Sequence, residues 1–312
     1  MRIELVPSKW RQRFVTTLCH PLVTRLRFIR QRGMIAPTGA TTRYDHSLGV
    51  AELGLQSAAA LRARYPDRVS ETAVALVGIA ALLHDVGHGP LSHMFDDCHF
   101  PRVATHEHRS AQHASTAAPY LDADQLAFVR HCIAPDAYEA PPCFAPGGLA
   151  AIVVANSTGF DVDRVDYVER DARACGVGLP FAYHARTILA GLRLDTGGAL
   201  VLTRDAEHHV EQMMKSRAWM ISHVYTDSRA AAVHAAARRT LEAIDSCGDA
   251  GSLIGAPGVG TMAAICNNPT LFALLDDRCF AAAARNGTPS TRAAACEYMI
   301  AERTYLSSMQ VW

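Results

Sequence analysis

The sequence predicts an all-α protein with at most one small β-hairpin. Apolar residues recur at helical spacing along most of the 312 residues, and capping residues precede many of these stretches. A strand pattern occurs only over residues 192–202, where two short apolar runs flank an Asp-Thr-Gly-Gly turn. Residues 80–97 begin as a dense apolar run and end in a His-Asp pair followed by glycines and a proline. This pattern is typical of a buried helix that stops at a polar site.

The first half of the chain is expected to be a series of helices with short connections. Gly33 ends the first of them, Ser70 and Thr105 cap two others, and Asp122 with Gln125 forms a capping box. The helix after Ser70 is apolar on nearly all sides, which predicts a central position. The expected elements are an irregular segment over residues 1–20, a short helix over 21–33, a loop over 37–40, and helices over 45–64, 70–83, 91–98, 105–118 and 125–133.

The second half is expected to hold the hairpin and a boundary between two parts. Gly176 closes one helix and Asp205 caps a long one. A flexible stretch over residues 248–260 is the expected boundary between a core over residues 1–247 and a C-terminal helical extension over 248–312 that packs on the core. The expected elements are a loop over 135–148, helices over 149–156 and 161–175, the hairpin, a long helix over 205–244, and helices over 261–275 and 290–309.

Composition and charge exclude several classes of protein. Thirty basic and thirty acidic residues balance, with a pI near 7.2, which argues against a nucleic-acid or membrane-surface binder. The nine cysteines are scattered without a C-x-x-C motif, which indicates a reduced, cytoplasmic protein. The N-terminus lacks the apolar core of a signal peptide, and the apolar run over residues 73–83 is too short to span a bilayer.

Histidine is unevenly distributed along the chain. Seven of the fifteen lie within one thirty-residue window, namely His84, His88, His93, His99, His106, His108 and His113. Histidine and aspartate are ligand types that hold a divalent transition metal and leave positions open. Asp85, at the foot of an apolar helix, needs a cation or strong donors to compensate its burial. The alternative is a satisfied core histidine beside a helix-terminal carboxylate, and the His-Asp pair alone leaves both open.

Further acidic and imidazole groups fall at helix starts, where they suit a metal site. His46 lies in the first turn of its helix, a His-Glu pair opens another, and Asp163 opens a third. Asp163, Tyr167 and Asp171 are spaced four apart, so they share one helix face. This face predicts a metal at the helix start and a hydroxylated ligand along it. The alternative is a solvated face of a surface helix.

The order of these residues resembles the H…HD…D signature of HD-domain phosphohydrolases, which are metal-dependent, all-helical enzymes. The blocks LRFIRQRG, RYDHSLGV, LLHDVGHGPLSHMFD, THE and DVDRVDYVERD resemble those of dNTP triphosphohydrolases of the SAM-and-HD-domain type, in the same order over about residues 20–230. The resemblance implies an HD-domain helical bundle. It also implies hydrolysis of (deoxy)nucleoside triphosphates to nucleoside and triphosphate, with metal-activated water attacking the α-phosphorus.

The resemblance also implies a role for each matching residue. One divalent metal ion (Fe, Mn, Mg, Co or Zn), with room for a second, would be held by His46, His84, Asp85 and Asp163. Catalytic or phosphate-contacting roles, with a histidine (His93 foremost) protonating the leaving 5′-oxygen, would fall to His88, His93, Asp96, His106 and Glu107. The triphosphate would be bound by Arg43, Arg164 and Arg217, because a polyphosphate needs several guanidinium groups. The sugar and its 3′-hydroxyl would contact Gln31, Tyr167, Asp171 and Tyr225.

Two positions depart from the pattern of this family. Arg32 stands where the family usually has a Leu that packs on sugar and base, and Ile221 stands where a His is expected one turn after Arg217. Both lie at the nucleoside end, so base, sugar or phosphate-chain length can differ. Arg25 and Arg27 match basic positions near the family's allosteric site, although surface arginines on a helix are the simpler interpretation. The sequence is therefore compatible with a homo-oligomer but does not require one.

The sequence leaves three alternatives for the function. The first is a related hydrolase of another nucleotide or phosphate ester, such as a modified nucleoside triphosphate or a monophosphate. The second is an HD-fold oxygenase with two irons, which would require His88 and His106 as ligands of a second metal. The third is a non-catalytic nucleotide sensor, which the complete H…HD…D set disfavours. The expected partner is a small nucleotide, without membrane or nucleic acid.

Overall fold

The computed structural model describes residues 1–33, 41–141, 147–154 and 159–309. In these ranges helices dominate, and the named strands β1 (Leu192–Leu194) and β2 (Leu200–Leu202) form one antiparallel hairpin, which confirms the predicted all-α class. The α-helices are α1 (Arg11–Leu18), α2 (Pro21–Thr24), α3 (Arg43–Arg64), α4 (Glu71–Leu83), α5 (His93–Asp96), α6 (His106–Ala117), α7 (Ala123–Ile133), α8 (Val162–Ala174), α9 (Ala185–Ala190), α10 (Arg204–Met220), α11 (Ser228–Ser246), α12 (Met262–Cys266), α13 (Pro269–Phe272), α14 (Cys279–Asn286) and α15 (Pro289–Met309).

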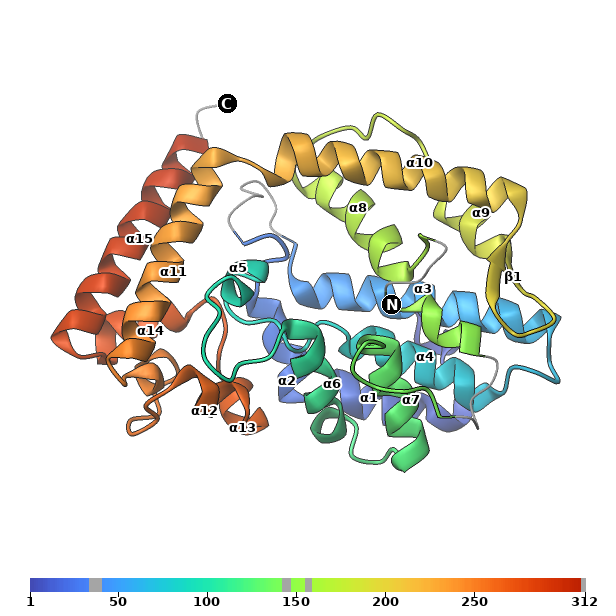
Figure 1. Ribbon diagram of the computed structural model, residues 1–312, viewed down its shortest axis with the longest axis horizontal. Coiled ribbons are helices and arrows are strands. Elements are labelled where there is room, and N and C mark those ends of the chain that lie inside the picture. The colour runs from blue at the N-terminus through green and yellow to red at the C-terminus, as the bar shows by residue number, and fades with distance from the viewer. Residues whose placement is uncertain (34–40, 142–146, 155–158, 310–312) are drawn as a thin grey trace.

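Helices α3 and α4 run through the centre of the molecule (Figure 1). All residues of α4 from Ala73 onward are buried, as its uniformly apolar sequence predicts. The start of α3 is fixed by a capping box between Thr42 and Asp45. Gly78 lets the two helices approach closely, because a Cβ atom there would lie 2.6 Å from the side chain of Leu55. The central pair therefore gives the ends of both helices a rigid position.

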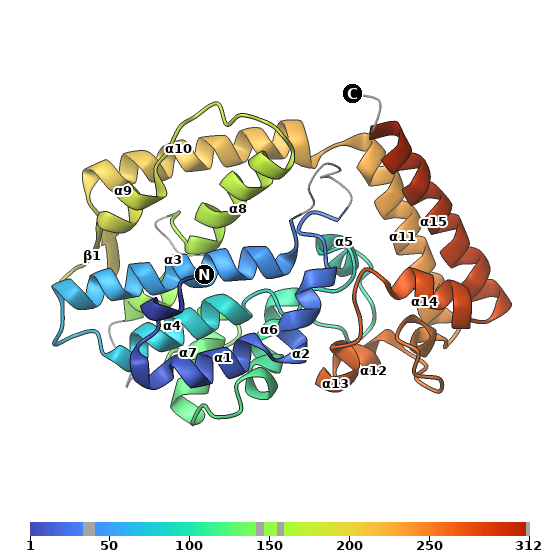
Figure 2. The same cartoon turned by 180° about the vertical axis from the view of Figure 1, so that it is seen from behind.

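Most of the other helices pack around this pair or at the two ends of the molecule. Helix α8 packs between α3 and α10, while α6 and α7 pack together on the α4 side. Helices α11, α14 and α15 lie together at one end of the molecule, and α9 with the hairpin lies at the other (Figures 1 and 2). The division into a core over residues 1–247 and an extension over 248–312 stays a prediction.

The prediction of an irregular N-terminal segment is wrong. Residues 1–20 hold two 3₁₀ turns, Ile3–Leu5 and Ser8–Trp10, and the helix α1. Helix α1 buries only Phe14 and Thr17, so its sequence carries too few apolar residues to produce a clear period.

The helix predicted over residues 21–33 ends early. Helix α2 passes into a 3₁₀ turn, Arg25–Phe28, and the chain is then extended, with Arg30 bridged to Thr42. The backbone N–H of Arg30 donates to Asp277 at 2.9 Å, a bond to the distant C-terminal region that the local sequence does not reveal.

The single long helix predicted over residues 205–244 is also wrong. The residue before α10 is Thr203, so Asp205 is not the cap. A π-helical turn, Ile221–Tyr225, follows α10, and Asp227 then caps α11 by accepting a hydrogen bond from the backbone of Arg229. A π-turn widens the helix by one residue per turn, which often occurs at functional sites.

Smaller differences occur at other boundaries. The stretch predicted as one helix over 261–275 is α12 and α13, because Asn268 caps α13 with Pro269 at its first position. Helices α9 and α14 were not predicted, and 149–156 is a 3₁₀ turn (Gly147–Ile152) with residues 155–156 outside the described part. A further 3₁₀ turn, Ala250–Leu253, interrupts the predicted flexible stretch. The predicted loop over 37–40, and residues 142–146 of the predicted loop over 135–148, also lie outside the described residues.

Within the described ranges, no helix combines the length and apolarity that crossing a membrane requires. The cysteines that the structure describes are all free thiols, and Cys143 lies outside the described residues.

Candidate active site

The side chain of His84 leaves the end of α4 with a fixed orientation. Its Nδ1 donates to the carbonyl of Ala81, one turn earlier, at 2.8 Å, which leaves Nε2 free to face the site. Gly87 then lets the loop pack against α6, because a Cβ atom there would lie 2.2 Å from the carbonyl oxygen of His106. The glycine signal in the sequence therefore marks a close contact between two elements that both carry histidines.

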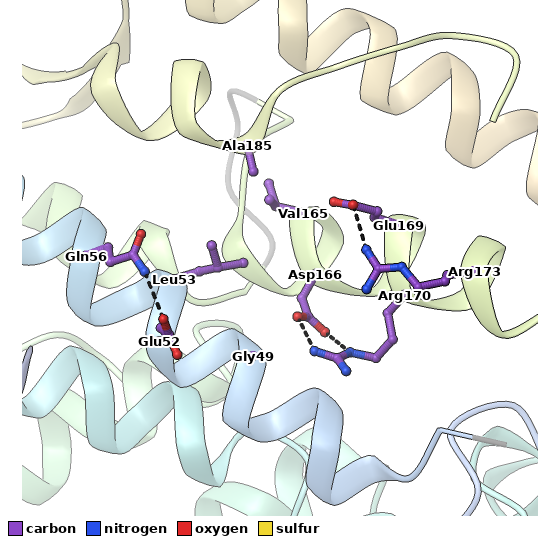
Figure 3. Close-up of a pocket in the computed structure, with 10 residues that line it drawn as sticks. All are labelled: Gly49, Glu52, Leu53, Gln56, Val165, Asp166, Glu169, Arg170, Arg173 and Ala185. Carbon is purple, nitrogen blue, oxygen red and sulfur yellow. Dashed lines mark hydrogen bonds and ion pairs between the residues drawn. The ribbon is translucent and has the colours of Figure 1, made fainter. Parts of the chain in front are cut away.

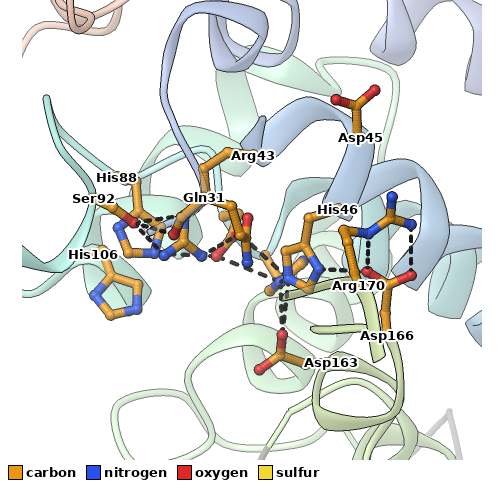
Figure 4. A network of polar contacts seen from close by, with 12 residues as sticks. Gln31, Arg43, Asp45, His46, His88, Ser92, His106, Asp163, Asp166 and Arg170 are labelled. Atoms are coloured by element: carbon orange, nitrogen blue, oxygen red, sulfur yellow. Dashed lines mark hydrogen bonds and ion pairs between the residues drawn. The ribbon is translucent and has the colours of Figure 1, made fainter. Parts of the chain in front are cut away.

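The four expected metal ligands lie close together, and Figure 4 shows two of them, His46 and Asp163, facing each other. His46 Nε2 lies 2.9 Å from Asp163 Oδ1 and 3.3 Å from His84 Nε2. Asp85 Oδ1 lies 3.4 Å from His84 Nε2, and Asp85 Oδ2 lies 3.6 Å from His46 Nε2. One ligand atom each of His46, His84 and Asp163 lies within 4.8 Å of the others, a spacing that suits a single ion.

The electrostatics of this cluster also fit a cation. Burial alone would lower the pKa of His46, but hydrogen bonds to Asp163 and Asp166 raise it to about 10. Burial would also lower the pKa of His84, but Asp85 and Asp163 together raise it. Burial would raise the pKa of Asp85, but the charges of Arg43, His84 and His88 together hold it well below its usual range. The cluster thus combines two imidazoles of raised pKa with ionised carboxylates. These nitrogen and oxygen ligands favour the binding of a divalent cation.

Asp166 and Arg170 support His46 from behind and were missed by the sequence analysis. His46 Nδ1 donates to Asp166 Oδ2 at 2.7 Å, and Arg170 holds the same carboxylate with two bonds of 2.7 and 2.8 Å. Gly49 makes room for this pair, since a Cβ atom there would lie 2.0 Å from Asp166 Oδ1. Figure 3 shows the pair on the floor of a separate pocket of about 220 Å³ between α3 and α8. The spacing of Asp163, Asp166 and Arg170 on one helix was the available signal.

We expect Asp166→Asn to weaken metal binding by about ten- to a hundredfold, the usual effect of losing the carboxylate behind a metal-bound imidazole. Titration of metal-free protein with Mn²⁺, followed by calorimetry, measures this change. Glu169→Gln is the matched control, because this exposed carboxylate on the same helix pairs with Arg173 instead. Equal metal affinity in wild type and Asp166→Asn would show that Asp166 only holds α8 on α3.

Beside the metal ligands lies a second cluster of imidazoles. The ring of His106 stacks on His88 with 3.9 Å between centroids, and His93 meets both rings edge-on at about 5 Å. His88 is fully buried with Nε2 3.2 Å from Asp85 Oδ1, so it links the two clusters. His93 opens to the cavity, and the surrounding protein and the charge of Arg43 lower its pKa.

His106 is oriented by a carboxylate and a buried arginine. Its Nδ1 donates to Asp96, and its Nε2 lies 3.2 Å from Glu107. Arg109, which is 1% exposed, donates to Asp96 Oδ1 at 2.7 Å and to the carbonyl of Gly87 at 2.8 Å. Burial would raise the pKa of Asp96, but these hydrogen bonds and the charge of Arg109 lower it to about 2. An ionised carboxylate at Nδ1 leaves His106 Nε2 available for proton transfer.

Arg43 is buried and held by two partners. It donates to Asp85 Oδ2 at 2.7 Å and to Ser92 Oγ at 2.8 Å, and Ser92 Oγ donates to the carbonyl of Gln31 at 3.1 Å. Ser92 has φ of 67° and Leu91 has φ of 57°, a conformation that costs about 1–3 kcal/mol per residue. Asp277 maintains it by accepting the N–H of Leu91 at 2.7 Å. The sequence analysis did not identify Ser92 or Asp277.

The remaining expected substrate residues except Asp171 line one cavity of about 260 Å³, together with the metal ligands His84, Asp85 and Asp163. Arg164 folds back onto Asp161, the cap of α8, at 2.7 Å, and Arg217 donates through Nε to the hydroxyl of Tyr167. The cavity is lined by Gln31, Arg32, Arg43, His84, Asp85, His93, His106, Glu107, Ile133, Val154, Asp163, Arg164, Tyr167, Arg217, Ile221 and Tyr225. The structure thus brings together expected site residues from six separate segments of the sequence.

Arg25 and Arg27 were both interpreted as surface arginines, and the structure differs for one of them. Arg25 is not a surface residue: it is 3% exposed and donates to the carbonyls of Val86 and His88 at 2.8 and 2.6 Å. Its side chain therefore supports the HD loop. Arg27 is exposed, and stacks on the ring of Tyr44.

Residues 43–132 match the HD domain family. The chain carries an HD domain. It is 27% identical over 227 residues to an HD domain-containing protein of Acanthamoeba polyphaga mimivirus, covering 65% of this chain and 48% of that protein. It is 31% identical over 195 residues to deoxynucleoside triphosphate triphosphohydrolase SAMHD1 of Bos taurus, covering 52% of this chain and 33% of that protein. The human SAMHD1 is 31% identical over 193 residues, covering 52% and 31%.

This HD-domain chain spans about half the length of the viral relative and about a third of the SAMHD1 proteins. The matches make this chain similar to the HD domain and to a part of the SAMHD1 proteins. An HD domain implies a divalent metal, and the His/Asp cluster of this chain fits one.

Proposed function

We propose that this chain hydrolyses nucleoside triphosphates, deoxynucleoside triphosphates among them, to nucleoside and triphosphate with the help of one divalent metal ion. The observation that carries the proposal is the shared cavity. It is lined by three of the expected metal ligands (His84, Asp85 and Asp163), by His106, whose ring is oriented by Asp96, and by the three arginines Arg43, Arg164 and Arg217. A metal-dependent phosphohydrolase needs these three kinds of group together.

His46, His84, Asp85 and Asp163 would hold the metal ion, which supplies a polarised phosphorus–oxygen bond and a water of lowered pKa. Arg43 donates to the expected ligand Asp85 and therefore lies beside the metal site. Its remaining N–H groups would donate to the phosphate oxygens on which negative charge accumulates. Arg164 and Arg217 line the same cavity and would bind the outer phosphates once they exchange Asp161 and Tyr167 for substrate.

The sugar 5′-oxygen is a poor leaving group, so a proton must reach it. His93 opens directly to the cavity, and its nearness to Arg43 favours the neutral ring until a polyanion enters. His106 presents Nε2 with Asp96 behind Nδ1, an arrangement that suits either orienting the water with Glu107 or passing the proton to His93. Two adjacent imidazoles in contact thus provide a path for one proton.

A second candidate function is supported by one observation. His88, His93, Asp96 and His106 place ligand atoms within 4.8 Å of one another, so a second ion and a two-iron oxygenase are the alternative. Against it, Arg43 lies beside this cluster and Arg109 already holds Asp96. Metal content per chain and dependence of turnover on dioxygen separate the two functions. The choice of metal, a cytoplasmic location and a homo-oligomer stay predictions.

The deciding experiment is turnover of a nucleotide panel with Mn²⁺, Mg²⁺ and Fe²⁺ in water enriched in ¹⁸O. We expect tripolyphosphate and nucleoside as products, with the label in tripolyphosphate, because attack at the α-phosphorus adds the water oxygen there. Release of orthophosphate or pyrophosphate would replace this proposal with cleavage of a phosphoanhydride bond instead of the bond to the 5′-oxygen.

The role of Arg217 can be tested through phosphate-chain length. We expect Arg217→Ala to raise KM for a triphosphate about ten- to a hundredfold and to change KM for the monophosphate little. Loss of one charge-assisted hydrogen bond costs about 1.5–3 kcal/mol. Arg173→Ala is the control, since Arg173 is exposed on α8 and pairs with Glu169 outside the cavity. Equal effects on both substrates would remove Arg217 from the phosphate end.

A further inference from the structure

At one end of the cavity, the guanidinium group of Arg32 lies over two tyrosine rings. The guanidinium carbon of Arg32 lies 3.6 Å from the ring centroid of Tyr225 and 5.2 Å from that of Tyr167. The side chain of Arg32 is only 17% exposed, so it is a wall of the cavity rather than a surface group. Two aromatic faces would ordinarily form the platform for a sugar or base, and here a guanidinium already covers one of them.

The same arginine covers the carboxylate behind the two rings. Arg32 Nε donates to Asp171 Oδ2 at 2.6 Å, and the hydroxyl of Tyr225 donates to the same oxygen at 2.9 Å. Asp171 is 1% exposed and is not part of the cavity lining. Its other oxygen, Oδ1, has no hydrogen-bond partner among the described residues and is itself inaccessible. A sugar hydroxyl could reach this carboxylate only if Arg32 moved away.

Strong recognition of a substrate hydroxyl requires a protein group that is left unpaired when the hydroxyl is missing. Arg32 and Asp171 Oδ2 are paired with each other, so removal of a sugar hydroxyl leaves neither of these two groups without a partner. Arginine also offers donors only, and a hydroxyl at either sugar position can accept from it without being required.

We propose that Arg32 makes this site indifferent to the sugar hydroxyls, so that ribo-, 2′-deoxyribo- and 2′,3′-dideoxyribonucleoside triphosphates are all substrates. This inference rests on the proposed triphosphate hydrolysis and names the breadth of its substrate class. Specificity then comes from the phosphate chain, where the metal ligands and Arg43, Arg164 and Arg217 lie.

The experiment compares kcat/KM for ATP, dATP and ddATP with the Mn²⁺-loaded enzyme. We expect the three values to agree within about tenfold, less than the loss of one charge-assisted hydrogen bond would produce. A preference of more than about a hundredfold for dATP over ddATP or ATP would overturn the inference and leave triphosphate hydrolysis standing. Failure to hydrolyse any triphosphate would instead overturn the proposed function, and the inference with it.

A second arm tests whether Arg32 is the cause. Arg32→Leu uncovers Asp171, and we expect the dATP:ddATP ratio of kcat/KM to rise about ten- to a hundredfold, because the 3′-hydroxyl can then donate to the carboxylate. Arg68→Leu is the matched control, since Arg68 stacks on Tyr65 outside the cavity. An unchanged ratio in folded Arg32→Leu would overturn the role of Arg32. The wild-type panel decides the inference even when this variant does not fold.

Discussion

We expect Asp85→Asn to abolish both metal binding and the proposed phosphohydrolase activity, while the helical fold remains. Asp85 contributes one oxygen near His84 and the other near His46, so its amide variant withdraws the charge that balances the ion. Asn is preferable to Ala because Arg43 is 4% exposed and would be left as a buried, unpaired charge, at a cost of about 3–5 kcal/mol. Asn keeps an oxygen that accepts from Arg43.

The measurements are metal content by atomic emission, far-ultraviolet circular dichroism, and turnover at saturating nucleotide. Asp67→Asn, at an exposed position before α4, is the control for the loss of one carboxylate. Full metal occupancy in Asp85→Asn, with the fold intact, would remove Asp85 from the set of ligands.

Asp96→Asn lowers kcat by about 10²–10⁴-fold, the usual contribution of an oriented acid or base. The amide oxygen still accepts from Arg109, but the amide nitrogen then faces His106 Nδ1 and favours the ring form with its proton on Nε2. The imidazole is thus held in the wrong tautomer, although its position changes little.

A pH profile of kcat together with metal content distinguishes this effect from general damage to the site. We expect Asp96→Asn to retain the metal and to lose the limb of the profile that His106 controls. Asp97→Asn is the matched control, because the next carboxylate along the chain is exposed. If both variants lowered kcat equally, α5 as a whole would be responsible and the Asp96–His106 pair would not.

The candidate metal ligands, which the family resemblance implies, could be placed from the sequence because they lie at helix ends. His84 and Asp85 end an apolar helix, and His46 and Asp163 each begin one, so capping and periodicity place them without knowledge of the packing. Their roles remain predictions. The spacing of Asp166 and Arg170 on α8 indicates an ion pair, but the pairing of Asp166 with His46, 120 residues away, forms only in the folded chain.

The errors in the predicted fold also come from features that form only in the folded chain. The continuous helical period across residues 205–244 gave no sign of the π-turn that carries Ile221 and Tyr225 into the cavity. Arg25 was interpreted as a surface residue because arginine on a short amphipathic segment usually is one. Its three backbone acceptors, including the carbonyls of Val86 and His88, exist only in the folded chain.

Asp277 connects the C-terminal region to the catalytic loop, and this bears on how the enzyme can be engineered. It accepts the N–H of Leu91 and that of Arg30, and its own N–H donates to the carbonyl of Phe28. Excision of residues 43–132 as a portable module would therefore leave the strained Leu91–Ser92 backbone without Asp277, and the hydroxyl of Ser92 without its acceptor, the carbonyl of Gln31. A graft of this activity into another scaffold has to bring a carboxylate to the same two amides.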